Sequence, residues 1–209
     1  MLPVMTLTDI AKRLNQDHGQ GENLPPVFFI TDSQAVADPE KVISALPAGS
    51  AVILRDYDYP AREKLGADLR ALCRERMIVF LVAGDAGLAS KLSADGVHLP
   101  EGLMGRATDI RAAHGHWMIT VSCHDLVSVR RAKKLPIDAG LIAPVFPTLS
   151  HPETLSGTRP ILGLSGLRHI VAATALPLYA LGGVTANNAG QLVGSGVAGI
   201  AAIRGFEQS

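Results

Sequence analysis

Three residues whose side chains could take part in catalysis or bind an anion lie where short apolar runs end. His124 follows the run 118–122 (MITVS), and its imidazole, whose ordinary pKa lies near neutrality, is suited to general acid–base catalysis. By position alone, a structural or solvent-exposed histidine is an equally good interpretation. His98, at the end of GVHL, is ambiguous in the same way. Arg55 ends another run and suits either a phosphate or a neighbouring carboxylate.

Two glycine-containing turns near the carboxyl terminus favour phosphate binding. Gly182 and Gly183 let a ligand approach the backbone closely, and Thr185 is expected to cap a helix whose unpaired N–H groups would face the same ligand. Ile203 and Arg204 supply further backbone donors with a cation beside them. The alternative interpretation is that the glycines only allow tight turns.

A long loop is predicted over 144–162 (PVFPTLSHPETLSGTRPIL), which is rich in Pro, Ser, Thr and Gly. Loops longer than about 12–15 residues in a compact domain are usually functional lids or disordered. Thr148, Ser150 and His151 are its candidate ligand contacts. A mobile surface insertion would have the same composition, and the two interpretations are compatible.

Eight short apolar runs are expected to be the strands that position these residues. They are nearly continuous rather than alternating, which is typical of strands buried on both faces of a parallel sheet. Eight strand–helix units in a chain of this length predict an α/β fold, a TIM (β/α)8 barrel with functional loops after its strands. An open doubly wound sheet is the alternative. The runs are 27–31, 51–55, 78–82, 96–99, 118–122, 140–143, 178–182 and 198–203.

Helical patterns fill the intervals between the runs. An apolar stripe with helical spacing extends from Leu65 to Cys73 in an otherwise charged stretch. Asp125, Ser165 and Thr185 are the predicted helix starts, because their side chains can accept hydrogen bonds from the first N–H groups of a helix.

The two ends of the chain depart from the repeating pattern. The segment 6–14 (TLTDIAKRL) is predicted to form a helix that closes the bottom of the barrel. Only 204–209 follow the eighth run, so the last helix is expected to be truncated. Because no linker or strong internal repeat is visible, residues 1–209 are interpreted as a single domain.

The charge balance and the cysteine content limit the classes of partner and the compartment that we expect for this protein. Among 209 residues, 19 Lys and Arg balance 19 Asp and Glu, so no overall field attracts nucleic acid or a membrane surface. Charged residues interrupt the amino terminus before an apolar run reaches signal-peptide length. Two cysteines are too few for a disulfide framework. We therefore expect a cytoplasmic protein with a small-molecule partner.

From Phe28 onward, the order of motifs resembles the thiamine phosphate synthase and TenI family, whose members are single barrels of about this length. The resemblance implies that a thiazole phosphate is bound by Thr148, Ser150, Gly163, Gly182, Gly183, Ile203 and Arg204. The matching motifs are FFITD (28–32), ADGVHLP (94–100), APVFPT (143–148), ILGLSGLRHI (161–170) and LYALGGVTANNA (178–189).

The diphosphate and magnesium side of the family pattern is altered. Of the motif Gln-x-Arg-x-Lys, only Arg55 survives in ILRDY (53–57). The motif Asn-Asp-Arg, which includes a metal carboxylate, aligns with 83–85 (AGD). The second metal carboxylate falls at Leu103, with Glu101 the nearest acid, and the lysine of the long loop is replaced by His151.

The resemblance therefore implies a TenI-like thiazole tautomerase, with His124 as its acid/base, no metal and no cofactor. One alternative is an atypical thiamine phosphate synthase that uses Mg²⁺, with the missing ligands replaced by Asp56, Asp58, Asp85 or Glu101. Another is a non-catalytic barrel that binds a phosphorylated metabolite. The expected partner is a small phosphorylated metabolite, and by analogy a second copy of the chain in a homodimer.

Overall fold

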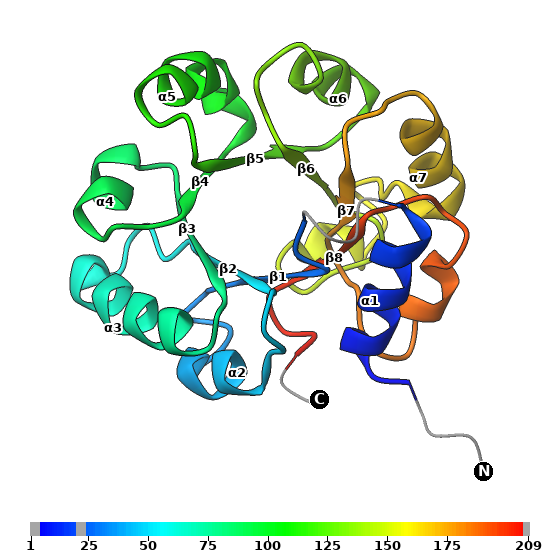
Figure 1. Ribbon diagram of the computed structural model, residues 1–209. Helices are drawn as coiled ribbons and strands as arrows, with labels where there is room; N and C mark the ends of the chain where they lie inside the picture. Colours follow the sequence, from blue (N-terminus) through cyan, green and yellow to red (C-terminus); the bar gives the residue numbers. More distant parts are fainter. Residues whose placement is uncertain (1–4, 20–23, 207–209) are drawn as a thin grey trace.

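The computed structural model describes residues 5–19 and 24–206. Its strands pair in parallel in chain order, and the first also pairs with the eighth, so the sheet closes into a barrel (Figure 1). This confirms the predicted (β/α)8 barrel, and the open doubly wound sheet is excluded. The strands are β1 (Val27–Ile30), β2 (Ala51–Leu54), β3 (Val79–Ala83), β4 (Gly96–Leu99), β5 (Met118–Cys123), β6 (Ala139–Ile142), β7 (Leu178–Ala180) and β8 (Gly199–Ala202).

Side chains alternate along each strand between two hydrophobic cores, one under the helices and one inside the barrel. Outward residues such as Phe29 pack under the helices, whereas inward residues such as Phe28 and Tyr179 fill the barrel. The rings of Phe28 and Tyr179 meet edge to face with centroids 4.7 Å apart. The Tyr179 hydroxyl donates to the Pro25 carbonyl at 2.8 Å. These side chains fill the interior of the barrel, and in barrels of this kind a ligand binds at the carboxyl ends of the strands.

The helices form an outer ring around the sheet (Figure 1). The predicted stripe is confirmed in α3, which buries Leu69 and Cys73, and Asp125 caps α6 as predicted. The helices are α1 (Leu7–Asp17), α2 (Pro39–Ala45), α3 (Arg62–Glu75), α4 (Ala86–Lys91), α5 (Ala107–Ala113), α6 (Leu126–Ala132) and α7 (Gly163–Ala172). Three 3₁₀ segments are η1 (Glu101–Arg106), η2 (Pro152–Thr154) and η3 (Ala189–Leu192).

Two predicted helix starts were wrong. Helix α7 begins before Ser165, because the Gly163 N–H is satisfied by the Val145 carbonyl at 3.1 Å and needs no side-chain cap. After Thr185 the chain forms only the short segment η3. The Asn188 side chain accepts from the Thr185 N–H at 2.9 Å and donates to the Gly183 carbonyl at 2.8 Å, which closes a turn in place of a helix.

Helix α1 was predicted as a helix but was assigned the wrong place. It lies beside β8 and β1 in the outer ring, not across the bottom of the barrel (Figure 1). Its buried stripe includes Leu7, Ile10 and Leu14, and Asn15 donates to the Ala198 carbonyl at 3.0 Å. Helix α1 therefore covers the outer face of the sheet beside β8 and β1 and also contacts η3.

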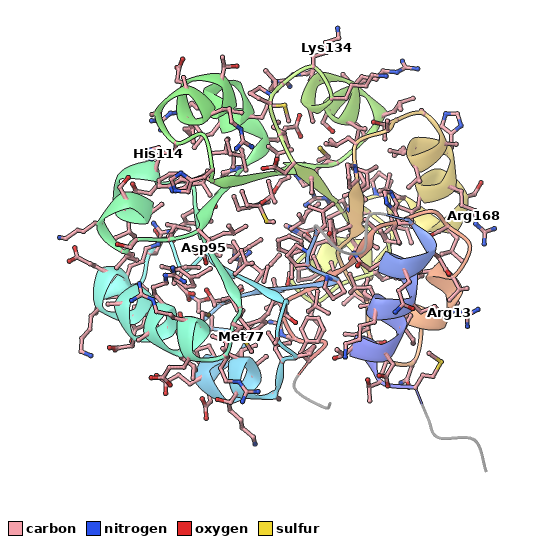
Figure 2. All side chains as sticks on the ribbon, in the orientation of Figure 1. Arg13, Met77, Asp95, His114, Lys134 and Arg168 are labelled. Carbon is pink, nitrogen blue, oxygen red and sulfur yellow. The ribbon has the colours of Figure 1, made fainter. Side chains whose placement is uncertain are left out.

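The outer surface of the ring is polar. Side chains such as Arg13 of α1 and Arg168 of α7 project into solvent, as does Lys134 in the turn after α6 (Figure 2). Cys73 and Cys123 are both buried and unpaired by disulfide. No helix within 5–19 or 24–206 is long and apolar enough to span a membrane.

Candidate functional site

A cavity of about 800 Å³ opens at the carboxyl ends of the strands. Most of the residues singled out from the sequence line it, although they come from distant parts of the chain. Gly163 lies outside its lining, and the Gly163 N–H is already bonded within the fold. The cavity contains Arg55, His124, Thr148, Ser150, His151, Gly182, Gly183, Ile203 and Arg204.

One wall of the cavity is built from glycine turns. Gly182 and Gly183 have φ of 92° and 67°, a region that favours glycine. A Cβ at Gly183 would lie 2.2 Å from the Pro147 carbonyl oxygen, so the turn after β7 passes directly beneath the long loop. Because no helix begins here, any backbone donors for an anion belong to these loops and not to a helix start.

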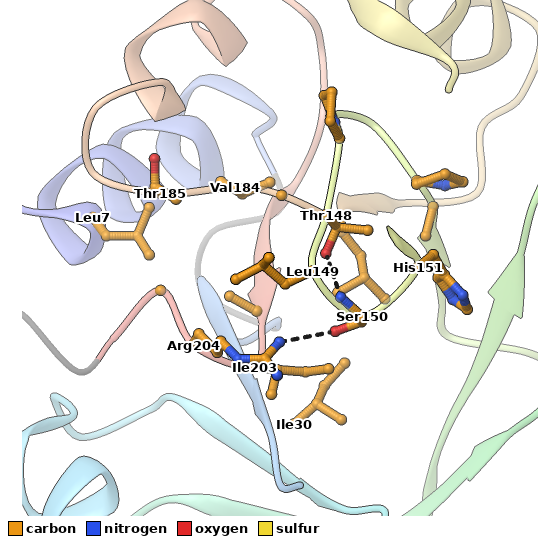
Figure 3. A pocket seen from close by; sticks show the side chains of 18 of the residues that line it. Leu7, Ile30, Thr148, Leu149, Ser150, His151, Val184, Thr185, Ile203 and Arg204 are labelled. Atoms are coloured by element: carbon orange, nitrogen blue, oxygen red, sulfur yellow. Dashed lines mark hydrogen bonds between the residues drawn. The ribbon is translucent and has the colours of Figure 1, made fainter. Parts of the chain in front are cut away.

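The loop after β6 crosses the cavity and meets the turn after β8. Arg204 Nη1 donates to Ser150 Oγ at 3.2 Å, and Thr148 and His151 lie beside this contact (Figure 3). The guanidinium and the hydroxyl together form a polar corner next to the glycine turns. A dianionic phosphate would find a cation, a hydroxyl and close backbone approach in this corner.

The same loop is internally bonded. The buried Thr154 hydroxyl accepts from the Thr148 N–H at 2.8 Å and donates to the His151 carbonyl at 2.7 Å. Arg159 Nη1 lies 3.0 Å from His151 Nδ1. Burial and the nearby Arg159 guanidinium lower the pKa of His151. These bonds give the loop a defined shape, whereas composition alone was equally consistent with a mobile insertion.

His124 has a fixed orientation at the mouth of the cavity. Its Nδ1 lies 2.9 Å from the Ala143 carbonyl oxygen, which can only accept, so Nδ1 carries the proton. In the neutral ring, Nε2 is then the unprotonated nitrogen. The His124 N–H donates to Ser128 Oγ at 3.0 Å, where Asp125 begins α6. The cap of this helix thus holds a ring that can accept a proton.

His98 also lines the cavity but has a different environment. It is only 6% exposed, and burial lowers its pKa to about 4. Its ring nitrogens lie 2.9 Å from the hydroxyls of Thr120 and Ser122. A ring that stays neutral at physiological pH is poorly suited to donate and recover protons there. His98 and His124, which the sequence left equally ambiguous, thus differ in burial and in their hydrogen-bond partners.

Ser122 and Tyr57 are among the cavity-lining residues that were not selected from the sequence. Ser122 is two positions before His124 on β5, and strand periodicity could have placed it on the inward face. Tyr57 replaces a basic residue of the family motif, and its ring lies over Gly84, where an added Cβ would be 3.1 Å from Cε1. Only the fold brings Tyr57 and Gly84 together, since they follow different strands.

The arginine on this side is already partnered. Arg55 forms an ion pair with Asp32. Next to it, Arg62 stacks on the Tyr57 ring, with the guanidinium carbon 5.2 Å from the ring centroid. Arg62 also donates to the carbonyls of Leu54 and Ala83 at 3.2 and 2.7 Å. Side chains of this chain therefore occupy the space at the ends of β2 and β3.

The acids proposed from the sequence do not form a magnesium site. Asp56 accepts from Thr31 and from the Ser33 N–H; burial acts to raise its pKa, but these hydrogen bonds lower it overall. Asp85 accepts from the Leu88 N–H at the start of α4, and Glu101 is 3.5 Å from Arg131. Within the described residues, no three His, Cys, Asp or Glu side chains converge as a metal site. Asp56, Asp85 and Glu101 therefore already have partners within the chain and do not converge on a common point.

Comparisons with known proteins agree with one family. The thiamine monophosphate synthase family matches residues 27–206. The thiamine-phosphate synthase of Pyrococcus furiosus is 34% identical over 181 residues, which cover 85% of this chain and 84% of that protein. The enzyme of the same name from Bacillus mycoides is 32% identical over 189 residues, covering 86% and 84%.

Solved structures lead to the same assignment. The thiamine phosphate pyrophosphorylase of Pyrococcus furiosus superposes with a TM-score of 0.69 at 30% identity, covering 85% of this chain and 84% of that one. The citrate synthase SbnG superposes with a TM-score of 0.61 at 14% identity, which shows a shared fold alone. The chain belongs to the thiamine monophosphate synthase family, which includes the TenI proteins.

Proposed function

We propose that the cavity binds a thiazole phosphate and that the protein isomerises a thiazole carboxylate phosphate to its aromatic tautomer. One observation carries the proposal. The Ala143 carbonyl fixes the Nδ1 proton of His124, so that the neutral ring presents an unprotonated Nε2 at a cavity whose opposite wall suits a phosphate. A proton shift needs an acid/base and an anchored substrate, and both are available here.

The proposed step conserves atoms and charge. His124 Nε2 removes a proton from one carbon of the conjugated ring system, and a proton is returned at another position, so no group leaves. The phosphate serves only to bind the substrate, and none of its bonds is broken in this reaction. Ser150, Arg204 and the glycine turns would hold it at a constant distance from His124, which converts binding into orientation.

The second candidate is synthesis of thiamine phosphate from an aminopyrimidine diphosphate and a thiazole phosphate. It is favoured by the relatives, whose names describe thiamine-phosphate synthases. In the family this reaction uses Mg²⁺ to help a diphosphate leave. The chain weighs against it, because Arg55 is paired with Asp32 and the nearby acids are bonded elsewhere.

A pair of assays distinguishes the candidates. The purified protein is incubated with the first-formed tautomer, and aromatisation is followed by ultraviolet absorbance. We expect acceleration that falls by about 10²–10⁴-fold in His124→Ala. The matched control is His169→Ala, an exposed histidine of α7 outside the cavity. In parallel, both synthase substrates are supplied with a Mg²⁺ series and pyrophosphate is measured.

Each outcome assigns a function. Acceleration that depends on His124 supports the isomerase. Pyrophosphate release without acceleration of aromatisation would replace it by the synthase. Measurable affinity for the thiazole phosphate, with neither reaction, would identify a binding protein instead.

A further inference from the structure

A row of three hydrogen-bonded side chains lies between β4 and β5. His98 and Thr120 are direct partners across the two strands, and Ser122 follows two positions later on the same inward face. His98 Nδ1 lies 2.9 Å from Thr120 Oγ, and His98 Nε2 lies 2.9 Å from Ser122 Oγ. Thr120 is fully buried, whereas Ser122 is partly exposed and lines the cavity.

The buried end of the row determines the direction of its hydrogen bonds. Within 24–206, the Thr120 hydroxyl has a single hydrogen-bond partner, His98 Nδ1. If Nδ1 carried the proton, the Thr120 proton would be left without an acceptor in a site closed to solvent. Such a loss disfavours that arrangement by about tenfold or more. Thr120 therefore donates to Nδ1, and the proton of the neutral imidazole is on Nε2.

The direction of the hydrogen bonds at Ser122, the member of the row that lines the cavity, follows from this. Nε2–H donates to Ser122 Oγ, which leaves the Ser122 proton available to the cavity. We propose that Thr120 and His98 set Ser122 as a hydrogen-bond donor, and that the cavity selects ligands with an acceptor, a carboxylate oxygen or an unprotonated ring nitrogen, at this wall. His98 is a positioning residue in this scheme, because it acts through Ser122.

The neutral state of His98 supports the scheme. Burial lowers the pKa of His98 to about 4, so the ring has one proton throughout the neutral range. A doubly protonated ring would donate from both nitrogens, so that Thr120 Oγ would have to accept and the Thr120 proton would lose its acceptor. The direction of the hydrogen bonds among Thr120, His98 and Ser122 is thus constant over the neutral pH range.

The inference rests on the proposed function for the identity of the ligand, but its first test does not. Histidine-selective ¹⁵N labelling of the free protein reports the tautomer of each of its 7 histidines. The His98 signals are assigned by their loss in His98→Gln. We expect a protonated Nε2 and an unprotonated Nδ1 at pH 7. A protonated Nδ1 in the wild type overturns the inference, whatever the protein binds.

Variants of the row test its effect on binding. Thr120→Val removes the buried donor without changing the shape of the side chain, so both tautomers of His98 become populated. The affinity for a thiazole carboxylate phosphate should then fall about twofold, in proportion to the competent fraction. Thr120→Ser retains the donor and is the matched control. An unchanged tautomer and affinity in a folded Thr120→Val protein contradict the inference.

Ser122→Ala tests the contact with the ligand. Loss of one hydrogen bond to a charged or polar acceptor should weaken binding about tenfold. If the wild type binds the ligand and Ser122→Ala binds it equally well, Ser122 is no donor to it and the inference fails. If the wild type does not bind at all, the proposed function fails, and the tautomer of His98 still decides the direction of the row.

Discussion

At the scale of single residues, two of the histidines that line the cavity, His98 and His124, differ in what surrounds their nitrogens. His98 lies between two hydroxyls in the barrel interior, and burial holds its pKa at about 4. His124 bonds one carbonyl and is otherwise at the cavity mouth. The first arrangement gives both ring nitrogens of His98 a hydroxyl partner, whereas in the second only Nδ1 of His124 has a partner among the described residues. From sequence position alone, both residues were equally ambiguous between a catalytic and a structural role, because both lie at the end of a predicted strand.

The depressed pKa of His98 predicts a pH dependence of stability. In the unfolded chain the ring takes up a proton below its ordinary pKa of 6.5, but the folded protein resists this until about pH 4. The free energy of unfolding should therefore fall as the pH is lowered from 6.5 to 4, by about 3 kcal/mol. Urea unfolding across this range measures it. His98→Gln should show a shallower dependence, and parallel curves would contradict the prediction.

The glycine turn after β7 predicts a second residue-level effect. Gly183→Ala places a Cβ 2.2 Å from the Pro147 oxygen at a φ of 67°, so the turn and the loop above it must separate. We expect a loss of about 2 kcal/mol or more in unfolding free energy, with weaker phosphate binding. Gly190→Ala, where no atom lies within 4 Å of the added Cβ, is the control. It should change stability by less than about 1 kcal/mol.

At the scale of elements, the strands were predictable and several of their connections were not. Continuous apolar runs located all eight strands, because strands buried on both faces leave little room for polar residues. The place of α1 depends on its contacts with β8 and η3, which lie far from it in the sequence and which no local pattern encodes. The Thr185 carbonyl does accept from the Ala189 N–H at 2.9 Å, but the chain continues only as the short 3₁₀ segment η3 and not as the helix expected there.

In the site, likewise, some features could be predicted from the sequence and others could not. Motifs identified the residues around the glycine turns, but the pairing of Arg55 with Asp32 joins loops after different strands. Tyr57 packs over Gly84 for the same reason. Such contacts are long-range in sequence and become visible only when the barrel is closed.

Thr154 is expected to hold the loop after β6 in its observed shape. Thr154→Val removes a buried hydroxyl that bonds the Thr148 N–H and the His151 carbonyl. It leaves the Thr148 N–H unpaired, whereas the His151 carbonyl keeps its bond from the Thr154 N–H. The loss should be about 1–3 kcal/mol, concentrated in local opening of the loop. Hydrogen exchange at the Thr148 amide should accelerate. Thr158→Val, at an exposed position of the same loop, is the matched control, and equal exchange in both variants would rule out this role.

At the scale of the whole molecule, closure of the barrel couples the cavity to the opposite end of the strands. Each strand pairs with two neighbours, so no strand is an edge that can separate without breaking the ring. Trp117 lies just before β5, at the amino end of the barrel, and stacks on His114 with ring centroids 3.6 Å apart. The cavity lies beyond the other end of the same strand.

This coupling predicts that the chain unfolds as one unit. Trp117 is the only tryptophan, so its fluorescence reports on the amino end, while far-ultraviolet circular dichroism reports on all helices. The two denaturant transitions should coincide. A thiazole phosphate at 100 times its dissociation constant should raise the unfolding free energy seen by both probes by about 2.7 kcal/mol, because it binds the folded state alone. A ligand bound to an independently folding upper half would shift circular dichroism while leaving the Trp117 transition in place, and that separation would show that the closed sheet does not transmit binding across its length.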